Sequence, residues 1–263
     1  MKISFIGFGN MAQAIADGLL DNKDYQLWAA APSLSVQSTP QGISTHHHNA
    51  AIIADADIIV LAVKPLQMPA VFAEIQAKIP ANCLVISIAA GLNLAWFNKR
   101  ASSSLALVRA MPNIAASVRQ SATPLFANEL VTTRQRETAE RIFSAIGLTV
   151  WVKQESDIDA FTSLSGSGPA YIFLFMEAMI NAAKALGLSE EIATSFTLQT
   201  CLGALSLAST SELSLSELRN KVTSPAGTTA AAIEVFKSQG LETITLKAMK
   251  AAYERAQQLA QEH

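Results

Sequence analysis

The sequence predicts an α/β domain with a mostly parallel, doubly wound sheet over residues 1–153, followed by an all-α domain over residues 154–263. Two observations support this prediction. In the first half, short apolar runs alternate with amphipathic runs, which is the pattern of repeated βαβ units. From Asp157 onward, apolar residues recur at helical spacing, and the connections are short and rich in Ser, Gly and Pro.

Six apolar runs in the first domain are expected to form strands, at residues 2–6, 25–30, 58–63, 83–89, 105–109 and 148–152. The run at 58–63 is uninterrupted, as in a parallel strand buried on both faces. Helices are expected after the first strand and at 69–79 and 133–146. Because ligands bind beyond the carboxyl ends of strands in such sheets, the segments 64–65, 90–91 and 111–113 are expected at the rim of a site.

The second domain is expected to contain helices over 169–187, 190–209, 214–220, 228–238 and 241–261. The stretch 171–188 is apolar enough to raise the question of a membrane span. Glu177, Asn181 and Lys184 interrupt it on one face, whereas a spanning helix needs about twenty apolar residues. We therefore expect no membrane span but a helix buried nearly all round, and a homodimer formed through these apolar helices.

Composition excludes several classes of protein. The formal net charge is −2 and neither half of the chain is strongly basic, so no nucleic-acid partner is expected. Cys83 and Cys201 form neither a CxxC pair nor a disulfide framework, which favours a reduced, cytoplasmic setting. The chain enters a core strand at Lys2, and no signal peptide is expected ahead of it.

The first functional motif is Gly7-Phe8-Gly9-Asn10-Met11-Ala12, between the first strand and an amphipathic run. Gly7 permits a tight turn, Gly9 lets the backbone approach a pyrophosphate, and Ala12 is the small residue where the helix packs on the strand. The N–H groups at the helix start then face the phosphates, with the favourable end of the helix dipole. The motif predicts a Rossmann-like domain that binds a dinucleotide.

The end of the second strand bears on which dinucleotide binds. A site that prefers NAD usually places an acid there, to hold the ribose 2′-hydroxyl. This chain instead has Trp28-Ala29-Ala30-Ala31-Pro32-Ser33, with no carboxylate to repel a 2′-phosphate and no arginine to clamp one. NADP is therefore favoured as the cofactor, and NAD is also possible.

No metal site is expected. His46, His47 and His48 are adjacent, so their side chains are expected to point in different directions, and no other ligand lies at suitable spacing. We expect a solvated loop there. Asp55 and Asp57 bracket the start of a strand and are expected to be exposed.

Two Ser/Thr-rich clusters precede helices of the second domain, Ser165-Gly166-Ser167-Gly168-Pro169 and Thr223-Ser224-Pro225-Ala226-Gly227-Thr228-Thr229. Such residues commonly cap helices, and capping is expected for both clusters. A helix start with hydroxyls and free N–H groups also makes a site for a carboxylate. Two such sites in a domain with few charges suggest a small anionic substrate.

The second domain lacks a residue suited to moving the proton of an alcohol. Hydroxyacid dehydrogenases usually use His or Lys for this step, and apart from His263 the domain contains no histidine. In β-hydroxyacid dehydrogenases, which share this two-domain plan, a lysine follows a GxG turn by four residues, and counting from Gly168 gives Ile172 here. An imine fits better, because its protonated form accepts hydride at carbon directly.

Six motifs resemble, in order and spacing, those of the pyrroline-5-carboxylate reductases. They are the glycine turn, Ala62-Val63-Lys64-Pro65, Ser87-Ile88-Ala89-Ala90-Gly91, Arg109-Ala110-Met111-Pro112-Asn113, and the clusters at 165–171 and 223–229. The resemblance runs through essentially the whole chain. It implies the last step of proline synthesis, with hydride passing from NAD(P)H to the C=N carbon of 1-pyrroline-5-carboxylate. It also implies a dimer interlocked through the helical domains, often assembled into a ring.

The resemblance also implies roles for single residues. Cofactor contacts fall on Phe8, Asn10, Met11, Asn49, Ala62, Val63, Lys64, Pro65 and Ala90, and Asn49 lies near the adenosine ribose. Substrate contacts fall on Glu212, Thr228 and Thr229. The amides and hydroxyls around Ser224, Thr228 and Thr229 are expected to hold the carboxylate, with the catalytic Thr229 hydroxyl near the ring nitrogen.

Three positions depart from the family pattern. Ala226 replaces the usual glycine, which is a mild change if its φ is negative. Ala31 stands where relatives often offer a hydroxyl to the 2′-phosphate, which leaves Ser33 for that contact. Glu212 lacks the glycine and proline common just after it. Two alternatives to the reductase remain: a β-hydroxyacid-type dehydrogenase of the same architecture, and a non-catalytic NADP-binding sensor.

Overall fold

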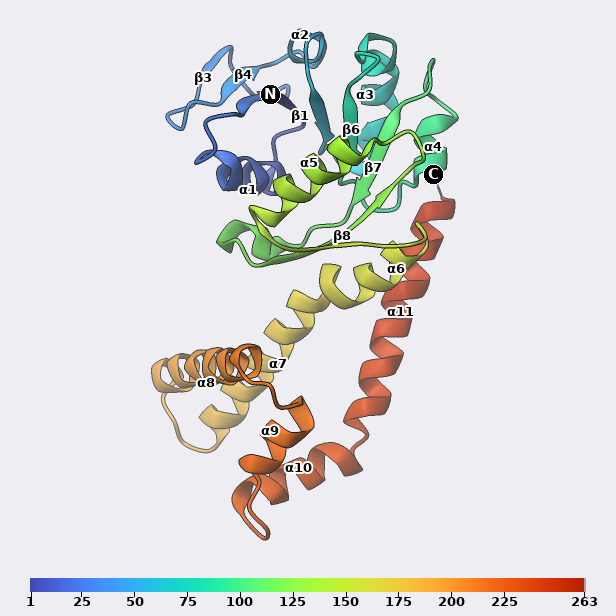
Figure 1. Cartoon of the computed structure of the whole chain (residues 1–263). Helices are drawn as coiled ribbons and strands as arrows, with labels where there is room; N and C mark the ends of the chain where they lie inside the picture. Colours follow the sequence, from blue (N-terminus) through green and yellow to red (C-terminus); the bar gives the residue numbers. More distant parts are fainter. Residues whose placement is uncertain (263) are drawn as a thin grey trace. The chain divides into compact units, whose positions relative to one another are not determined.

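The computed structural model describes residues 1–262 of the chain, which divide into two compact units (Figure 1). One unit comprises residues 1–169 together with the chain from Ala251 onward, and the other comprises residues 170–250. The sequence-based boundary between residues 153 and 154 stays a prediction.

Over the described residues, the first unit is built on a nine-stranded sheet in the order β3-β4-β2-β1-β5-β6-β7-β8-β9. The strands are β1 (Lys2–Ile6), β2 (Gln26–Ala30), β3 (Gln37–Ser38), β4 (Ser44–His46), β5 (Ile58–Leu61), β6 (Leu84–Ser87), β7 (Ala106–Ala110), β8 (Ser121–Ala127) and β9 (Gly147–Trp151). β3 pairs antiparallel with β4, as does β7 with β8, and the other neighbours are parallel. The predicted doubly wound, mostly parallel sheet is confirmed.

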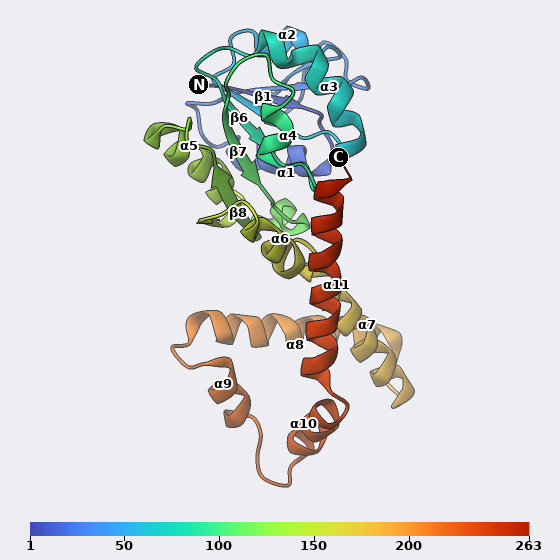
Figure 2. The same cartoon turned by 90° about the vertical axis from the view of Figure 1, so that its right-hand side faces the viewer.

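Helices cover both faces of this sheet. α1 (Asn10–Leu19) and α5 (Thr133–Ser144) pack into the core on one face, and α2 (Ala50–Ile53), α3 (Met68–Ile75) and α4 (Leu94–Asn98) pack into the core on the other. Figure 2 shows α5 and α3 on opposite sides of the strands. Because successive strand residues point to opposite faces, Phe5 enters the first core and Ile6 the second.

The strands expected from the sequence are confirmed, with ends that differ by about two residues at most. The helix expected over 69–79 is α3 followed by a 3₁₀ turn, Gln76–Lys78. Three strands were not expected: β3, β4 and β8. The pattern of β8 is obscured by polar residues at its start and by Pro124, which cannot donate a ladder hydrogen bond.

The remainder of the described chain is helical, which confirms the all-α prediction. α6 (Asp157–Phe161) runs through a π-helical turn, Thr162–Gly166, into α7 (Gly168–Ala185), and α8 (Glu190–Thr210), α9 (Leu215–Lys221), α10 (Thr228–Ser238) and α11 (Leu241–Gln261) follow. Each predicted helix is present. The starts of α8 and α9 agree with the prediction because Ser189 and Ser214 cap these helices, as expected from serines at helix starts.

The expectation that the helix at 171–188 is buried nearly all round is wrong for the single chain. Residues Ile172, Phe173, Leu174 and Phe175 of α7 are between 43% and 66% exposed. The apolar sequence of this helix leads us to expect that other parts of the same chain pack against it. Within the described chain, no other element covers these four side chains. Exposed apolar surface of this kind is typical of a protein interface.

Among the described helices, α8 is the one long and apolar enough to cross a membrane. Length and composition alone are weak evidence for a membrane span, because the core helices of soluble proteins pass the same test. α8 therefore carries no membrane assignment by itself.

Candidate active site

The parallel register brings most of the predicted cofactor residues to one edge of the sheet. Across neighbouring strands, one row of paired residues marks the carboxyl edge: His46, Ala30, Ile6, Leu61, Ser87 and Arg109. The glycine turn follows Ile6, the segment with Ser33 follows Ala30, and Asn49 follows His46 by three residues. Ala62–Pro65 and Ala90 follow Leu61 and Ser87 in the same way. The edge is therefore the predicted rim, as sheets of this class require.

The glycine turn is shaped for close approach of a ligand. Gly7 has a φ of +86°, and its N–H donates to the Ala30 carbonyl over 2.8 Å. A Cβ at Gly7 would lie 2.7 Å from Val63 Cγ1 and 2.9 Å from the Ala62 carbonyl carbon, so glycine is required for packing. A Cβ at Gly9 would meet no atom within 4 Å, so there glycine leaves open space instead.

The helix that follows this turn leaves its first N–H groups available. α1 begins after Gly9, which is extended (φ −80°, ψ −176°) and makes no side-chain cap. The first N–H groups of any helix lack intrahelical partners. Gln13 is occupied elsewhere, because its Nε2 donates to the Phe8 carbonyl over 2.9 Å. Bare amides beside open space at Gly9 fit a phosphate group, so these residues fit a dinucleotide.

The other predicted cofactor residues are positioned by backbone contacts. The Ala62 N–H donates to the Ile6 carbonyl over 2.8 Å, which places the segment from Ala62 to Pro65 beside the glycine turn. Lys64 is exposed, and Pro65 begins a short 3₁₀ helix. Ala90 precedes Gly91, whose φ of +76° turns the chain after β6.

The predicted adenosine end of the site contains Asn49 and Ser33. The Asn49 Nδ2 donates to Glu74 Oε2 over 3.0 Å, which ties the loop after β4 to α3. Ser33 is exposed in the loop after β2. This loop contains no charged residue over 31–36.

The three histidines between these residues do not point in different directions, contrary to the sequence-based expectation. Ring centroids of His46 and His47 lie 4.7 Å apart, and those of His47 and His48 lie 4.2 Å apart. The chain folds the rings together because the His48 N–H donates to His46 Nδ1 over 2.9 Å. His47 and His48 are exposed, as expected of a solvated loop. Within residues 1–262, no group of His, Cys, Asp and Glu is arranged to hold a metal ion.

Asp55 and Asp57 are exposed, as expected. Both interact with Lys2: its Nζ with the Asp55 carboxylate, and its backbone N–H with Asp57 Oδ2 over 2.7 Å. They lie at the amino end of β5 and take no part in the candidate site.

A second cluster of predicted residues lies in the other unit, where a tight turn leads into α10. The Gly227 N–H donates to the Ser224 carbonyl over 3.1 Å, and Pro225 and Ala226 are the central residues. Ala226 has a φ of +59°, so the condition for a mild exchange of glycine for alanine, a negative φ, is not met. Proline followed by a residue with positive φ is the pattern of a type II turn, which favours glycine at the second position.

The Ser and Thr side chains of this turn do not cap α10, contrary to expectation. The N-cap is Gly227, and it makes no side-chain cap. The Thr223 hydroxyl is occupied, donating to the Arg219 carbonyl over 2.6 Å. Within the described chain, the hydroxyls of Ser224, Thr228 and Thr229 have no hydrogen-bond partner. The three hydroxyls predicted to contact substrate are thus available for a ligand.

The expectation that the other Ser-rich cluster, at 165–169, caps the helix after it is also wrong. The chain is already helical when it reaches Ser165, whose hydroxyl donates back to the Phe161 carbonyl over 3.0 Å. The π-helical turn Thr162–Gly166 leads into α7 at Gly168, and the Ser167 N–H already donates to the Thr162 carbonyl, so this cluster does not present an open helix start to a carboxylate. Asn113 instead binds this segment, with its Nδ2 donating to the Ser165 carbonyl over 2.8 Å, so the two family motifs hold each other in place.

Glu212 is exposed in the bend between α8 and α9. Ser214 and Glu217 form a capping box at the start of α9. The whole of α9 therefore lies in the chain between Glu212 and the turn at 224–227. No hydrogen bond within the described residues joins Glu212 to that turn. Its role as a substrate contact stays a prediction.

Sequence reasoning missed the partners of Arg109, a buried residue at the carboxyl end of β7. Its guanidinium lies 3.2 Å from Glu155 Oε1 and 3.6 Å from Asp159 Oδ1. Glu155 Oε1 also accepts the Leu94 N–H over 2.8 Å. Burial raises the pKa of Asp159, and the neighbouring Arg109 only partly opposes this shift. An arginine in an apolar strand is itself a signal, because a buried charge needs acidic partners.

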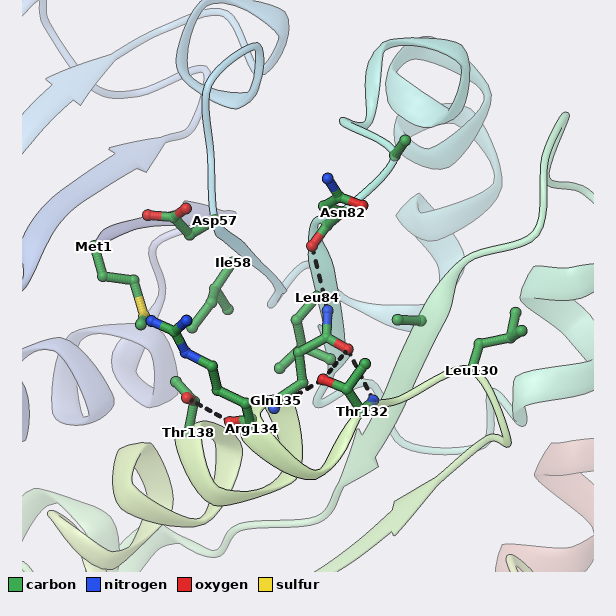
Figure 3. A pocket seen from close by; sticks show the side chains of 12 residues that line it. Met1, Asp57, Ile58, Asn82, Leu84, Leu130, Thr132, Arg134, Gln135 and Thr138 are labelled. Atoms are coloured by element: carbon green, nitrogen blue, oxygen red, sulfur yellow. Dashed lines mark hydrogen bonds between the residues drawn. The ribbon is translucent and has the colours of Figure 1, made fainter.

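A separate hollow of about 450 Å³ lies at the opposite, amino-terminal edge of the strands (Figure 3). Its lining includes Asp57, Asn82, Arg134 and Gln135, and the Gln135 Nε2 donates to the Asn82 carbonyl over 3.2 Å. None of the predicted site residues lines it.

The chain is similar over nearly its whole length to pyrroline-5-carboxylate reductases. It is 42% identical, over 99% of this chain and 97% of the other, to a pyrroline-5-carboxylate reductase of Pseudomonas aeruginosa. The chain belongs to the pyrroline-5-carboxylate reductase family. A member of this family from Vibrio alginolyticus is 41% identical over 98% of this chain and 97% of the other.

Solved structures of the pyrroline-5-carboxylate reductase family agree with the fold. The structure from Coxiella burnetii is 43% identical, with a TM-score of 0.91 over 98% of each chain. The Plasmodium falciparum structure, with NADP bound, is 28% identical, with a TM-score of 0.88 over 99% of this chain and 98% of the other. The reductase family therefore replaces the hydroxyacid dehydrogenase and the sensor as the interpretation of this chain.

Models of protein families match both parts of this pyrroline-5-carboxylate reductase chain. Residues 155–259 match the model for pyrroline-5-carboxylate reductase dimerisation, and residues 2–91 match that for NADP oxidoreductases, coenzyme F420-dependent. A dimerisation domain accounts for the exposed apolar side chains of α7, because a second subunit can cover them.

Proposed function

We propose that this chain catalyses the reduction of 1-pyrroline-5-carboxylate to L-proline with NAD(P)H. The observation that carries the proposal is the turn at 224–227 with the start of α10. Three hydroxyls that have no hydrogen-bond partner among residues 1–262 meet the amino end of a helix there. No histidine, lysine or arginine lies in the turn or the first turn of α10. Such a site suits a carboxylate whose neighbouring group needs no strong acid or base.

The first unit binds the nucleotide, which when bound supplies a hydride from its nicotinamide ring. Gly7, Gly9 and the first amides of α1 hold the pyrophosphate, supported by Phe8, Asn10 and Met11. Ala62, Val63, Lys64, Pro65 and Ala90 line the rim where the nucleotide extends along the sheet edge. Asn49 and Ser33 serve the adenosine ribose and its 2′ position, and NADP is preferred to NAD.

In the second unit, the helix start positions the imine. The N–H groups of α10 and the hydroxyls of Ser224 and Thr228 hold the substrate carboxylate. The Thr229 hydroxyl hydrogen-bonds the ring nitrogen, and Glu212 contacts the substrate. With the imine protonated, hydride adds to the C=N carbon, the π electron pair moves to nitrogen, and proline is released as the amine.

The assembly and setting follow from the same proposal. The helical region forms a homodimer, and dimers assemble further into a ring. The protein works in the cytoplasm, without a membrane, nucleic-acid or metal partner. α8 is then an interface helix. The two domains correspond to residues 1–153 and 154–263.

Nucleotide oxidation by the purified protein with this imine, run in parallel with NADPH and NADH, tests the function. Thr229→Ala is expected to lower kcat on the order of 10²-fold, the usual loss when one catalytic hydrogen-bond donor is removed. The NADPH Kd, measured by nucleotide fluorescence, should stay unchanged. Thr223→Ala is the matched control, because the Thr223 hydroxyl is already bonded to the Arg219 carbonyl.

Two results would count against the proposal. Unchanged turnover of Thr229→Ala would remove Thr229 from the mechanism. The absence of imine-dependent oxidation with either nucleotide would overturn the function itself, and turnover of a hydroxyacid would revive the dehydrogenase.

A further inference from the structure

We propose that His46, His47 and His48 form a proton-linked site for the 2′-phosphate of NADP, so that the preference for NADPH over NADH strengthens as the pH falls. The proposal rests on the proposed function, since it concerns the same nucleotide. It adds three residues to Ser33 as predicted contacts of the 2′-phosphate.

Strand register places the histidine cluster at the required part of the sheet. His46 pairs with Ala30, and its carbonyl accepts the Ala31 N–H over 3.2 Å. Gly7 bonds to the same residue, Ala30, from the opposite side. The cluster thus lies one strand beyond the end of β2, about 5 Å further along the sheet edge. In Rossmann-like domains, the end of the second strand is where the 2′ position of the ribose is recognised.

The loop after β2 cannot neutralise a 2′-phosphate alone. Residues 31–36 contain the hydroxyls of Ser33 and Ser35 but no cation. A phosphate monoester carries close to two negative charges at neutral pH. The three histidines, of which His46 ends β4 and His47 and His48 follow it, are the titratable groups beside this loop that can carry positive charge.

The geometry of the cluster couples the three rings. His46 Nδ1 accepts the His48 N–H, so the neutral ring carries its proton on Nε2. The centroids of His46 and His48 lie 5.7 Å apart, and His47 lies within 4.7 Å of both. Partial desolvation, followed by the charges of His48 and His46, lowers the pKa of His47. Without an anion, the rings therefore resist being protonated together.

Other charges around the cluster are few. β2 and β3, which pair with β4, contain no titratable residue, and neither does α2. Glu74 of α3 is an acidic residue near the cluster, and its carboxylate accepts a hydrogen bond from the Asn49 side chain. A bound dianion would be the dominant local charge, and it would raise the pKa of each nearby imidazole.

The sign of the pH dependence follows from this linkage. The histidine pKa values are higher with the phosphate bound than without it, so binding takes up protons. Affinity for the 2′-phosphate therefore rises as the pH falls between the bound and free pKa values. Below about pH 6 the phosphate itself gains a proton and loses charge, which limits the effect at the acidic end. NADH lacks the phosphate, so its affinity should stay flat.

Binding of 2′,5′-ADP and of 5′-AMP to the whole protein tests the proposal without catalysis. Calorimetry at pH 6.5, 7.5 and 8.5, on protein without a polyhistidine tag and with EDTA present, should show tighter binding of 2′,5′-ADP at lower pH. Uptake of one proton predicts up to about a tenfold change in Kd per pH unit. The Kd of 5′-AMP should stay constant.

Imidazole NMR gives a second readout, because the chain has only four histidines. With His263→Gln, the remaining resonances belong to the cluster, and 2′,5′-ADP should raise their titration midpoints while 5′-AMP should not. The double variant His47→Gln, His48→Gln alters two exposed side chains and should weaken the pH dependence, because only His46 of the cluster remains. Ser33→Ala should weaken 2′,5′-ADP binding equally at each pH.

The proposal is overturned if the Kd of 2′,5′-ADP has the same pH dependence as that of 5′-AMP, or if the double variant leaves it unchanged. Either result would mean that the histidine cluster is a solvated loop that takes no part in nucleotide binding. Binding of 5′-AMP and imine reduction with NADH do not involve the 2′-phosphate, so they report separately on the proposed function.

Discussion

Two helix starts, that of α1 in one unit and that of α10 in the other, have similar N-cap backbones but differ in their side chains. α1 follows Gly9 (φ −80°, ψ −176°), and α10 follows Gly227 (φ −81°, ψ 171°). Neither glycine provides a side-chain cap. A residue with positive φ precedes each: Gly7 (+86°) two positions before Gly9, and Ala226 (+59°) one position before Gly227. Both starts therefore present free N–H groups to an anion.

The difference lies in what surrounds the two N-cap glycines. A Cβ at Gly9 would meet nothing within 4 Å, whereas a Cβ at Gly227 would lie 2.4 Å from Ser224 Oγ. The first start is bare backbone beside open space, which suits a bulky pyrophosphate. The second keeps hydroxyls close to its amides, which suits a small carboxylate beside an imine. One backbone motif is thus adapted to two anions by removing or adding side chains.

Gly7→Ala is expected to have the largest effect on the fold. Its Cβ would press on Val63 Cγ1 and on the Ala62 backbone, and alanine would also be strained at a φ of +86°. Overpacking and left-handed strain together should lower the free energy of unfolding by about 3 kcal/mol. Urea unfolding at fixed protein concentration measures this loss.

Gly9→Ala is the matched variant at the same turn. It should change the free energy of unfolding by at most about 1 kcal/mol, the usual effect of alanine at an N-cap. The NADPH Kd should nevertheless rise about tenfold or more, because the new methyl group occupies the approach of the pyrophosphate. Unaltered NADPH affinity in Gly9→Ala would mean that the phosphates do not lie against this turn.

The fold was largely predictable because its signals are local. The uninterrupted run at 58–63 identified a buried strand, and serines before α8 and α9 marked helix starts. β8 escaped because Pro124 and polar residues obscure its pattern, and pairing with β7 and β9 supplies what the local sequence lacks. The exposure of α7 could not be predicted either, since it depends on a second subunit rather than on the helix itself.

Site residues were predictable as motifs but not as geometry. The cluster at 223–229 was correctly placed before a helix, yet Gly227 rather than a hydroxyl is the N-cap. The φ of Ala226 and the stacking of His46 with His47 depend on backbone turns that residue types alone do not determine. The acidic partners of Arg109 lie far away in sequence, so only the need for a counter-charge indicated them.

Gly227→Ala tests the second helix start and should have an intermediate effect. The new Cβ would displace the Ser224 hydroxyl, which is the movable end of a side chain, so stability should fall by only about 1 kcal/mol. The KM for the imine should rise about tenfold, equivalent to one lost hydrogen bond of about 1.4 kcal/mol. The NADPH Kd should not move, in contrast to Gly9→Ala.

Ser224→Ala provides the matched background for this comparison. With the hydroxyl already absent, adding Gly227→Ala should raise the KM little further. Full additivity of the two changes would contradict the proposed clash and place the effect of Gly227 elsewhere.

Ala226→Gly should have the smallest effect and the opposite sign to Gly7→Ala. Glycine removes the cost of a left-handed alanine, about 1 kcal/mol or more. It also gives the unfolded chain more freedom, which costs about 0.4–1 kcal/mol. The free energy of unfolding should therefore rise by about 0.5 kcal/mol, with kcat and KM unchanged because the turn keeps its shape. A loss of stability in urea unfolding would show that the alanine methyl group makes a contact, for example with the second subunit, that outweighs its backbone strain.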